Sequence, residues 1–367
     1  MKILHFSDTH LWFKINNSDR EQDFYDSFLR VIDYAIENKI EIVLHSWDLF
    51  HHSKPSNKSL AICIQWLLRL SEAGIQVIMI AGNHSTPRLS TQWHSFDIFT
   101  EIKNVNVFFK DYTEAIEIKG INFVNLPHIH DEKKFANELS EAWKYIKDWI
   151  NIYMSHLGIS AQNYDEYTDE ISWINIKKSD LESLQKYDYV AMGHYHKNFS
   201  IWNIHYSWSL EHTSFNQKSY RTWFNVISIK DSKIEKIDFI QNNSRKMLEY
   251  FIDCEGILST DELLEVIKSK DLDISGHIVK INFENMSTKM ILDFDDTEIC
   301  DFFKDSFYFE YRKIKKSKNT KISSENIKDS DNIIQDSFSD FWDKYEKNID
   351  THIDKEKLKN DILLKIK

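Results

Sequence analysis

Lys2-Ile3-Leu4-His5-Phe6-Ser7-Asp8-Thr9-His10 joins an apolar run directly to a polar Asp-x-His pair. A short run of this composition is typical of a buried strand. In an open α/β sheet, functional groups collect where the strands end at their carboxyl side. The stretch therefore predicts a strand that carries Asp8 and His10 to the edge of a sheet.

Four further polar clusters each follow an apolar run in the same way. They are Trp47-Asp48-Leu49-Phe50-His51, Gly82-Asn83-His84, Ser155-His156 and Gly193-His194-Tyr195-His196. Any one of them alone is more typical of a helix cap, a turn or a hydrogen-bonded core histidine. Five clusters in this order, each at the predicted end of a strand, favour a single shared site.

Seven side chains in these clusters are candidate metal ligands: Asp8, His10, Asp48, Asn83, His156, His194 and His196. Two divalent metals that share one bridging carboxylate need about this number, and nitrogen and oxygen donors without thiolate suit Mn²⁺, Fe or Zn. Such a pair, held ~3.5–4 Å apart, clamps a phosphoester and activates a water. His84 is additional to the ligands, and we expect it to donate a proton to the leaving group or to stabilise the transition state.

The other histidines are expected to pack, to form turns or to lie on the surface, with an approach of His128 and His130 to the site as the alternative. They are His5, His45, His52, His94, His128, His130, His205 and His212.

Composition narrows the class of protein. The chain has 367 residues, 42% of them hydrophobic, which fits one sizeable α/β domain and one or two smaller units. Three widely spaced cysteines and no long apolar window predict a cytoplasmic protein that does not enter a membrane. A net charge of −12 argues against nonspecific coating of nucleic acid, but it does not exclude a nuclease, because bound metals supply local positive charge.

The order of the elements predicts an α/β fold in which two sheets form a sandwich flanked by helices. Helical spacing is found over Glu21–Asn38, from Pro55 to about Ala73 with Ser56 or Asn57 as the cap, and over Glu132–Trp149. We place a core domain at 1–240, a small α+β module at 246–314, a linker at 315–331 and a helical segment at 332–367. The last segment has two amphipathic stretches, which usually need a partner to cover their apolar faces.

The ordered motifs resemble the calcineurin-like metallophosphoesterase superfamily. Asp48-Leu49-Phe50-His51 and the stretch 206–215 are similar to the SbcD-type exonucleases of DNA double-strand-break repair. The resemblance covers about residues 1–230, whereas 245–314 matches the capping domain of that family only in architecture. It implies a calcineurin-like core with a capping domain and C-terminal helices.

The resemblance also implies roles for single residues. One metal would be held by Asp8, His10, Asp48 and His196, and the other by Asp48, Asn83, His156 and His194. His84 would be the catalytic histidine, and His51 would contact the scissile phosphate. The resemblance further implies Mn²⁺ as the preferred metal, double-stranded DNA ends and hairpins as substrates, and a homodimer bound through 333–366 to an SbcC-type, SMC-like ATPase.

This sequence departs from the family pattern at five positions. Ser85 stands where the family usually has Asp, and Trp12, Trp47, Trp208 and Trp223 stand where it usually has Gly. The chain has 7 Gly and 11 Trp, so one cause could account for all four tryptophans. We interpret them as glycines of a gene in which UGA encodes glycine. The alternative is that they are genuine tryptophans of a diverged or impaired enzyme.

Three functions fit the sequence. The first is a metal-dependent exonuclease and endonuclease subunit of an SbcCD-like repair complex. The second is a phosphoesterase that acts on a small molecule or a phosphoprotein, against which the capping module and the helical segment argue. The third is a non-catalytic scaffold that tethers DNA ends, which gains weight only if the four tryptophans are genuine.

Overall fold

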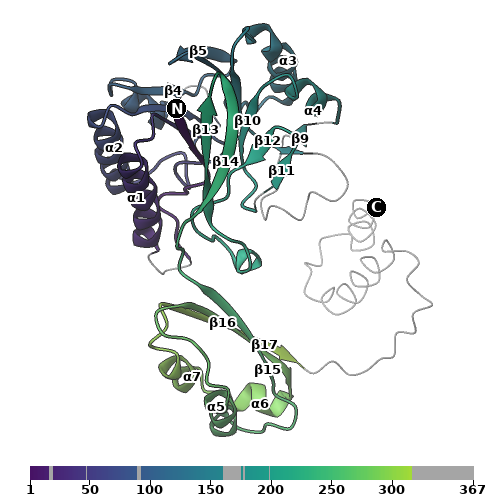
Figure 1. The fold of residues 1–367 in the computed structure, drawn as a ribbon. Coiled ribbons are helices and arrows are strands. Elements are labelled where there is room, and N and C mark those ends of the chain that lie inside the picture. The colour runs from purple at the N-terminus through teal and green to yellow at the C-terminus, as the bar shows by residue number, and fades with distance from the viewer. Residues whose placement is uncertain are drawn as a thin grey trace, which may run out of the picture. The chain divides into compact units, whose positions relative to one another are not determined.

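The computed structural model describes residues 1–15, 20–46, 48–88, 92–159, 175–176, 178–197 and 199–315 (Figure 1). Trp47, nearly all of the predicted linker and the whole predicted helical segment lie outside the described residues. Among the described residues, the structure has no helix that is both long and apolar enough to cross a membrane.

The first sheet has six strands in the order β14-β13-β1-β2-β3-β4. Its parallel strands are β1 (Lys2–Phe6), β2 (Ile42–His45), β3 (Gln76–Ile80) and β4 (Val105–Phe108), and β13 (Trp223–Lys230) and β14 (Lys233–Gln241) complete it in antiparallel pairing. Helices α1 (Glu21–Glu37) and α2 (Asn57–Glu72) pack on one of its faces. Ser56 is the cap of α2, because its side chain accepts a hydrogen bond from the main-chain N–H of Ser59.

The second sheet also has six strands, in the order β11-β12-β10-β7-β6-β5. They are β5 (Glu114–Ile118), β6 (Ile121–Asn125), β7 (Asn151–His156), β10 (Tyr189–Gly193), β11 (Phe199–Ile201) and β12 (Ile204–Tyr206). Strands β6, β7, β10 and β12 are parallel, and antiparallel β5 and β11 lie at the edges. Helices α3 (Glu132–Glu141) and α4 (Lys178–Leu184) belong to this half, and β8 (Gly158–Ile159) pairs with β9 (Asn175–Ile176).

The two sheets pack face to face, as the sequence predicts. Alternate residues of β2 divide between two cores: Ile42 and Leu44 lie in a cluster with Ile152 and Met154 of β7, whereas Val43 lies in the cluster under α1 and α2. Because successive side chains of a strand point to opposite faces, the first cluster marks the interior of the sandwich. The prediction of two sheets between helices is confirmed.

The helix predicted over Glu132–Trp149 is wrong in its second half. Helix α3 ends at Glu141, a 3-10 turn (η2) covers Ala142–Tyr145, and the chain then extends into β7. The Asn151 side chain accepts a hydrogen bond from the main-chain N–H of Lys147 and donates one to the main-chain oxygen of the same residue. These local bonds compete with helical hydrogen bonds and turn the chain toward the sheet.

The third region has a parallel three-stranded sheet, β15 (Met247–Asp253), β16 (Ile278–Met286) and β17 (Tyr308–Lys315), with helices α5 (Thr260–Ser269), α6 (Thr288–Asp293) and α7 (Asp296–Phe302). Its buried apolar residues form a core of their own. The sequence predicts these elements apart from α6. Residues 1–315 form one compact unit, and the division of this unit into a core and a capping domain stays a prediction.

Candidate metal centre

The predicted ligands meet at the carboxyl ends of β1, β2, β3, β7 and β10. Ligand atoms of Asp8, His10 and His196 lie within 4.8 Å of one another, and so do those of Asp8, Asp48 and His156. Asp8 belongs to both groups, so the two groups are contiguous. The parallel strands thus bring residues that are far apart in the chain to one place, as the sequence predicts.

The remaining two predicted ligands belong to the same cluster. The side-chain oxygen of Asn83 lies 2.9 Å from Nε2 of His156. The ring of His194 contacts the ring of His156, with centroids 4.9 Å apart, and the His194 main-chain N–H donates to both carboxylate oxygens of Asp8 at 3.1 Å. All seven predicted ligands are therefore assembled in one cluster, which we call the metal centre.

The chemistry of this cluster fits divalent metals. Asp8, His10 and Asp48 are at most 1% exposed. Nε2 of His10 lies 3.1 Å from Nε2 of His196, and a carboxylate oxygen of Asp48 lies 3.4 Å from Nε2 of His156. Buried carboxylates and imidazole nitrogens that converge in this way form the oxygen and nitrogen donor set that Mn, Fe or Zn accept.

The backbone of the metal centre is left-handed at four of these residues. The angle φ is +50° at Asp8, +40° at His10, +43° at Asp48 and +92° at His194. Residues other than glycine seldom adopt this conformation, which costs about 1–2 kcal/mol per residue. Strain of this kind is concentrated at functional sites, where the surrounding structure holds it.

One group that supports the metal centre was not predicted from the sequence. The Gln217 side-chain amide lies 2.9 Å from Nδ1 of His196, and the Thr213 hydroxyl lies 3.3 Å from the same nitrogen. Both contacts turn Nε2 of His196 toward His10. Gln217 is 1% exposed and lies in a short 3-10 turn (η4, Phe215–Gln217), which has no periodicity that could have indicated it.

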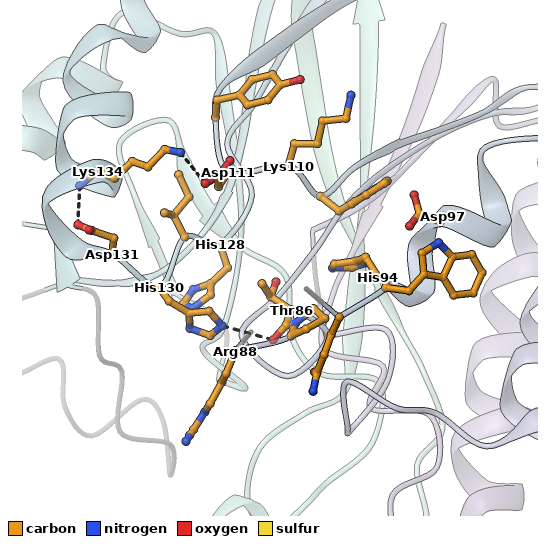
Figure 2. A pocket seen from close by; sticks show the side chains of 16 residues that line it. Thr86, Arg88, His94, Asp97, Lys110, Asp111, His128, His130, Asp131 and Lys134 are labelled. Atoms are coloured by element: carbon orange, nitrogen blue, oxygen red, sulfur yellow. Dashed lines mark hydrogen bonds and ion pairs between the residues drawn. The ribbon is translucent and has the colours of Figure 1, made fainter. Parts of the chain in front are cut away.

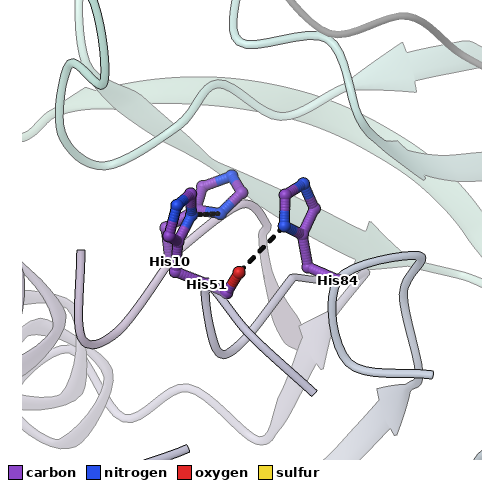
Figure 3. A group of neighbouring side chains, drawn as sticks. All are labelled: His10, His51 and His84. Atoms are coloured by element: carbon purple, nitrogen blue, oxygen red, sulfur yellow. Dashed lines mark hydrogen bonds between the residues drawn. The ribbon is translucent and has the colours of Figure 1, made fainter. Parts of the chain in front are cut away.

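The rings of His10, His51 and His84 gather beside the ligands (Figure 3). Nδ1 of His84 lies 2.9 Å from the main-chain oxygen of His51, and the main-chain N–H of His84 donates to Asp48 at 3.2 Å. The rings of His51 and His84 stack with centroids 5.3 Å apart. The two predicted catalytic histidines are therefore adjacent to each other and to the metal centre.

Among the other histidines, His128 approaches the metal centre, so the alternative interpretation holds for it. It is buried, and burial lowers its pKa to about 3, with further lowering from His130, His194 and His84 close by. His5 and His45 are buried in packed positions, as expected.

The tryptophans that stand in glycine positions differ in backbone conformation. Trp12 has φ of +76°, which favours glycine. Trp208 and Trp223 do not have a left-handed backbone; their rings stack with centroids 5.2 Å apart, and neither buried indole N–H has a hydrogen-bond partner among the described residues. The structure adds Trp202, with φ of +55° in the tight turn between β11 and β12.

Comparison with known proteins identifies the family. The profile of the calcineurin-like phosphoesterase family matches residues 1–198. The chain is 31% identical to the DNA double-strand break repair protein Mre11 of Saccharolobus solfataricus, over 55% of this chain and 51% of that protein. It is 31% identical to Mre11 of Methanocaldococcus jannaschii, over 65% and 66%, and 25% identical to the SbcD component of the nuclease SbcCD of Staphylococcus epidermidis, over 79% and 82%.

The chain spans about half of the length of the first of these relatives. The family profile covers more than half of this chain, from the first strand to the cluster that follows β10. Sequence and geometry together lead to one conclusion: the chain belongs to the calcineurin-like phosphoesterase family.

Proposed function

We propose that this protein is a metal-dependent DNA nuclease that hydrolyses phosphodiester bonds at double-stranded ends as part of an SbcCD-like repair complex. The observation that carries the proposal is the buried cluster of seven ligands with two histidines at its side. Relatives that are named as the DNA double-strand break repair protein Mre11 and as a component of the nuclease SbcCD support DNA as the substrate.

Two divalent ions, with Mn²⁺ preferred, fit this donor set. Asp8, His10, Asp48 and His196 would hold one ion, and Asp48, Asn83, His156 and His194 the other. The close approach of Asp8, His10 and His196 supports the first set, and the contacts of His156 with Asn83 and Asp48 support the second. When bound, the ions would supply an activated water and positive charge against the phosphate.

The protein's own groups would orient the substrate and move a proton. Nδ1 of His84 donates to the His51 main-chain oxygen, which holds a proton at Nδ1 and turns Nε2 away from that oxygen. His84 can then deliver a second proton from Nε2 to the leaving oxygen. His51, whose ring stacks on that of His84, would contact the scissile phosphate.

Partners follow from the same proposal. The nuclease would act as a homodimer, and the amphipathic stretches within 332–367 would bind an SbcC-type ATPase. The core domain at 1–240 and the capping domain at 246–314 would together bind DNA. Sedimentation of the full chain, alone and with the ATPase, tests both associations, and a monomer that does not bind the ATPase would contradict them.

The nuclease itself is tested with the full chain, its ATPase and Mn²⁺ on double-stranded ends, with the variants His84→Ala and Asp48→Ala. We expect cleavage by the wild type and its loss in both variants. Hydrolysis of a generic phosphodiester without DNA cleavage would favour a small-molecule or phosphoprotein phosphoesterase. Binding of DNA ends without any hydrolysis would favour a scaffold.

A further inference from the structure

A cavity of about 660 Å³ lies beside the metal centre (Figure 2). The order of the strands explains its place. Residues of the metal centre follow β1, β2 and β3 in one sheet and β10 and β7 in the other, and the loops after β4 and β6, the next strand in each sheet, line the cavity. Because the carboxyl ends of parallel strands share one edge, the cavity continues the edge on which the metal centre lies.

The cavity and the metal centre share part of their wall. Thr86, two residues beyond His84, lines the cavity, and its main-chain oxygen lies 3.4 Å from Nε2 of His130. His128 also lines the cavity and is close enough to His84 and His194 to interact with them electrostatically. A substrate strand that leaves the metal centre along this edge would reach the cavity directly.

The lining combines exposed aromatic surface with cations. Tyr112 is 39% exposed, and the ammonium group of Lys110 lies 5.9 Å from the centre of its ring. Arg88 and Lys134 add positive charge. Lys134 in turn forms an ion pair with Asp111 at 2.5 Å, which reduces the negative potential there.

A second acid of the lining is also engaged by the protein. Asp131 accepts hydrogen bonds from the main-chain N–H groups of Lys133 and Lys134 as the cap of α3. The lining is therefore suited to a ligand with a flat ring and an adjoining phosphate, because aromatic faces stack on any base and Arg pairs with phosphate oxygens.

We propose that this cavity binds an unpaired nucleotide of the DNA strand whose phosphodiester bond lies at the metal centre, with the base on Tyr112 and its phosphate at Arg88. The proposal rests on the proposed nuclease function and names the form of DNA that the site prefers. A blunt duplex must open a base pair before a nucleotide can enter the cavity, whereas an end with a single-stranded overhang need not. The protein should therefore bind overhangs more tightly than blunt ends.

The test measures the affinity of the full chain for two fluorescent duplexes, one blunt and one with a short overhang, with uncleavable phosphorothioate linkages. We expect the wild type to prefer the overhang and Tyr112→Ala to lower the affinity for the overhang about tenfold, so that the preference disappears. Arg88→Gln should weaken binding and reduce the salt dependence by about one ionic contact. The matched controls are Tyr145→Ala and Arg69→Gln, because both residues are exposed and neither lines the cavity.

Several outcomes would overturn the proposal. They are a wild type without any preference, a preference that survives in both Tyr112→Ala and Arg88→Gln, and dissociation of a dimer by either variant, which would assign the cavity to a second copy of the chain. Failure of the proposed function looks different. A wild type that prefers overhangs and hydrolyses bis(p-nitrophenyl) phosphate but does not cut DNA would sink the nuclease and leave the cavity supported.

Discussion

Nδ1 of His84 lies 2.9 Å from the main-chain oxygen of His51, and this contact sets the direction in which the His84 ring can act. If Nε2 gives its proton to the leaving oxygen, His84→Ala should slow DNA cleavage by about 10²–10⁴-fold. The loss should be much smaller for bis(p-nitrophenyl) phosphate, because p-nitrophenolate leaves without a proton. Rates of the two reactions under identical Mn²⁺ concentrations measure the difference.

The control for this experiment is His277→Ala, which removes a histidine of the third region of the chain. Equal losses for both substrates in His84→Ala would mean that His84 stabilises charge on the phosphate instead of delivering a proton.

Gln217 should tune the affinity for metal without contacting it. Its amide lies 2.9 Å from Nδ1 of His196, so Gln217→Ala should let the ring rotate and weaken Mn²⁺ binding by about 10–100-fold. Calorimetric titration with Mn²⁺ measures this directly, and excess Mn²⁺ should restore activity. Gln22→Ala is the control, because that exposed side chain bonds only within α1. Unchanged Mn²⁺ affinity in Gln217→Ala would show that packing alone holds His196.

Trp12 should be a source of instability. With φ of +76°, its replacement by glycine should raise the free energy of unfolding by about 1 kcal/mol, because an L side chain is strained there. The matched substitution Trp66→Gly should lower it by about 3–5 kcal/mol, since Trp66 is buried in α2 against Phe28. Urea denaturation of both variants tests the pair, and a loss of stability in Trp12→Gly would contradict the interpretation.

The gene sequence tests the same interpretation independently. We expect UGA codons at positions 12, 47, 208 and 223, and UGG at these positions would rule out recoding. The turn residue Trp202, which the structure adds, should also have a UGA codon, because its φ of +55° likewise favours glycine.

His94 should make the protein sensitive to mild acid. Burial lowers its pKa from 6.5 to about 4, and its Nδ1 accepts a hydrogen bond from the Phe96 main-chain N–H. The unfolded chain thus binds a proton at a higher pH than the folded one. The stability contribution of neutral His94 is complete above pH 6.5 and is lost, at about 1.4 kcal/mol per unit, as the pH falls toward 4.

His94→Asn keeps an acceptor for the Phe96 N–H and removes the titrating group. The free energy of unfolding of this variant should therefore fall less steeply than that of the wild type between pH 6.5 and 4. Chemical denaturation at several pH values measures both slopes, and parallel curves would show that His94 does not titrate in this range.

The sequence predicts the sandwich and the seven clustered residues because both depend on local patterns. A run such as Glu41–Leu44 carries its own signal for a strand, and the residue that follows a strand is placed by the sheet itself. The end of α3 depends instead on the side chain of Asn151, ten residues further on, which no helical periodicity reports. Gln217 and the cavity beside the metal centre depend on contacts between distant segments, so they required the structure.

The left-handed backbone of the metal centre has a consequence for how this protein can change. At Asp8, His10, Asp48 and His194, glycine would relieve the backbone while removing a predicted ligand. Asp48→Gly should therefore be more stable than Asp48→Ala, although both are inactive. Mutagenesis screened for thermal tolerance alone would drift toward glycine at these four positions, so it would erase the chemistry of the protein before it weakened the fold.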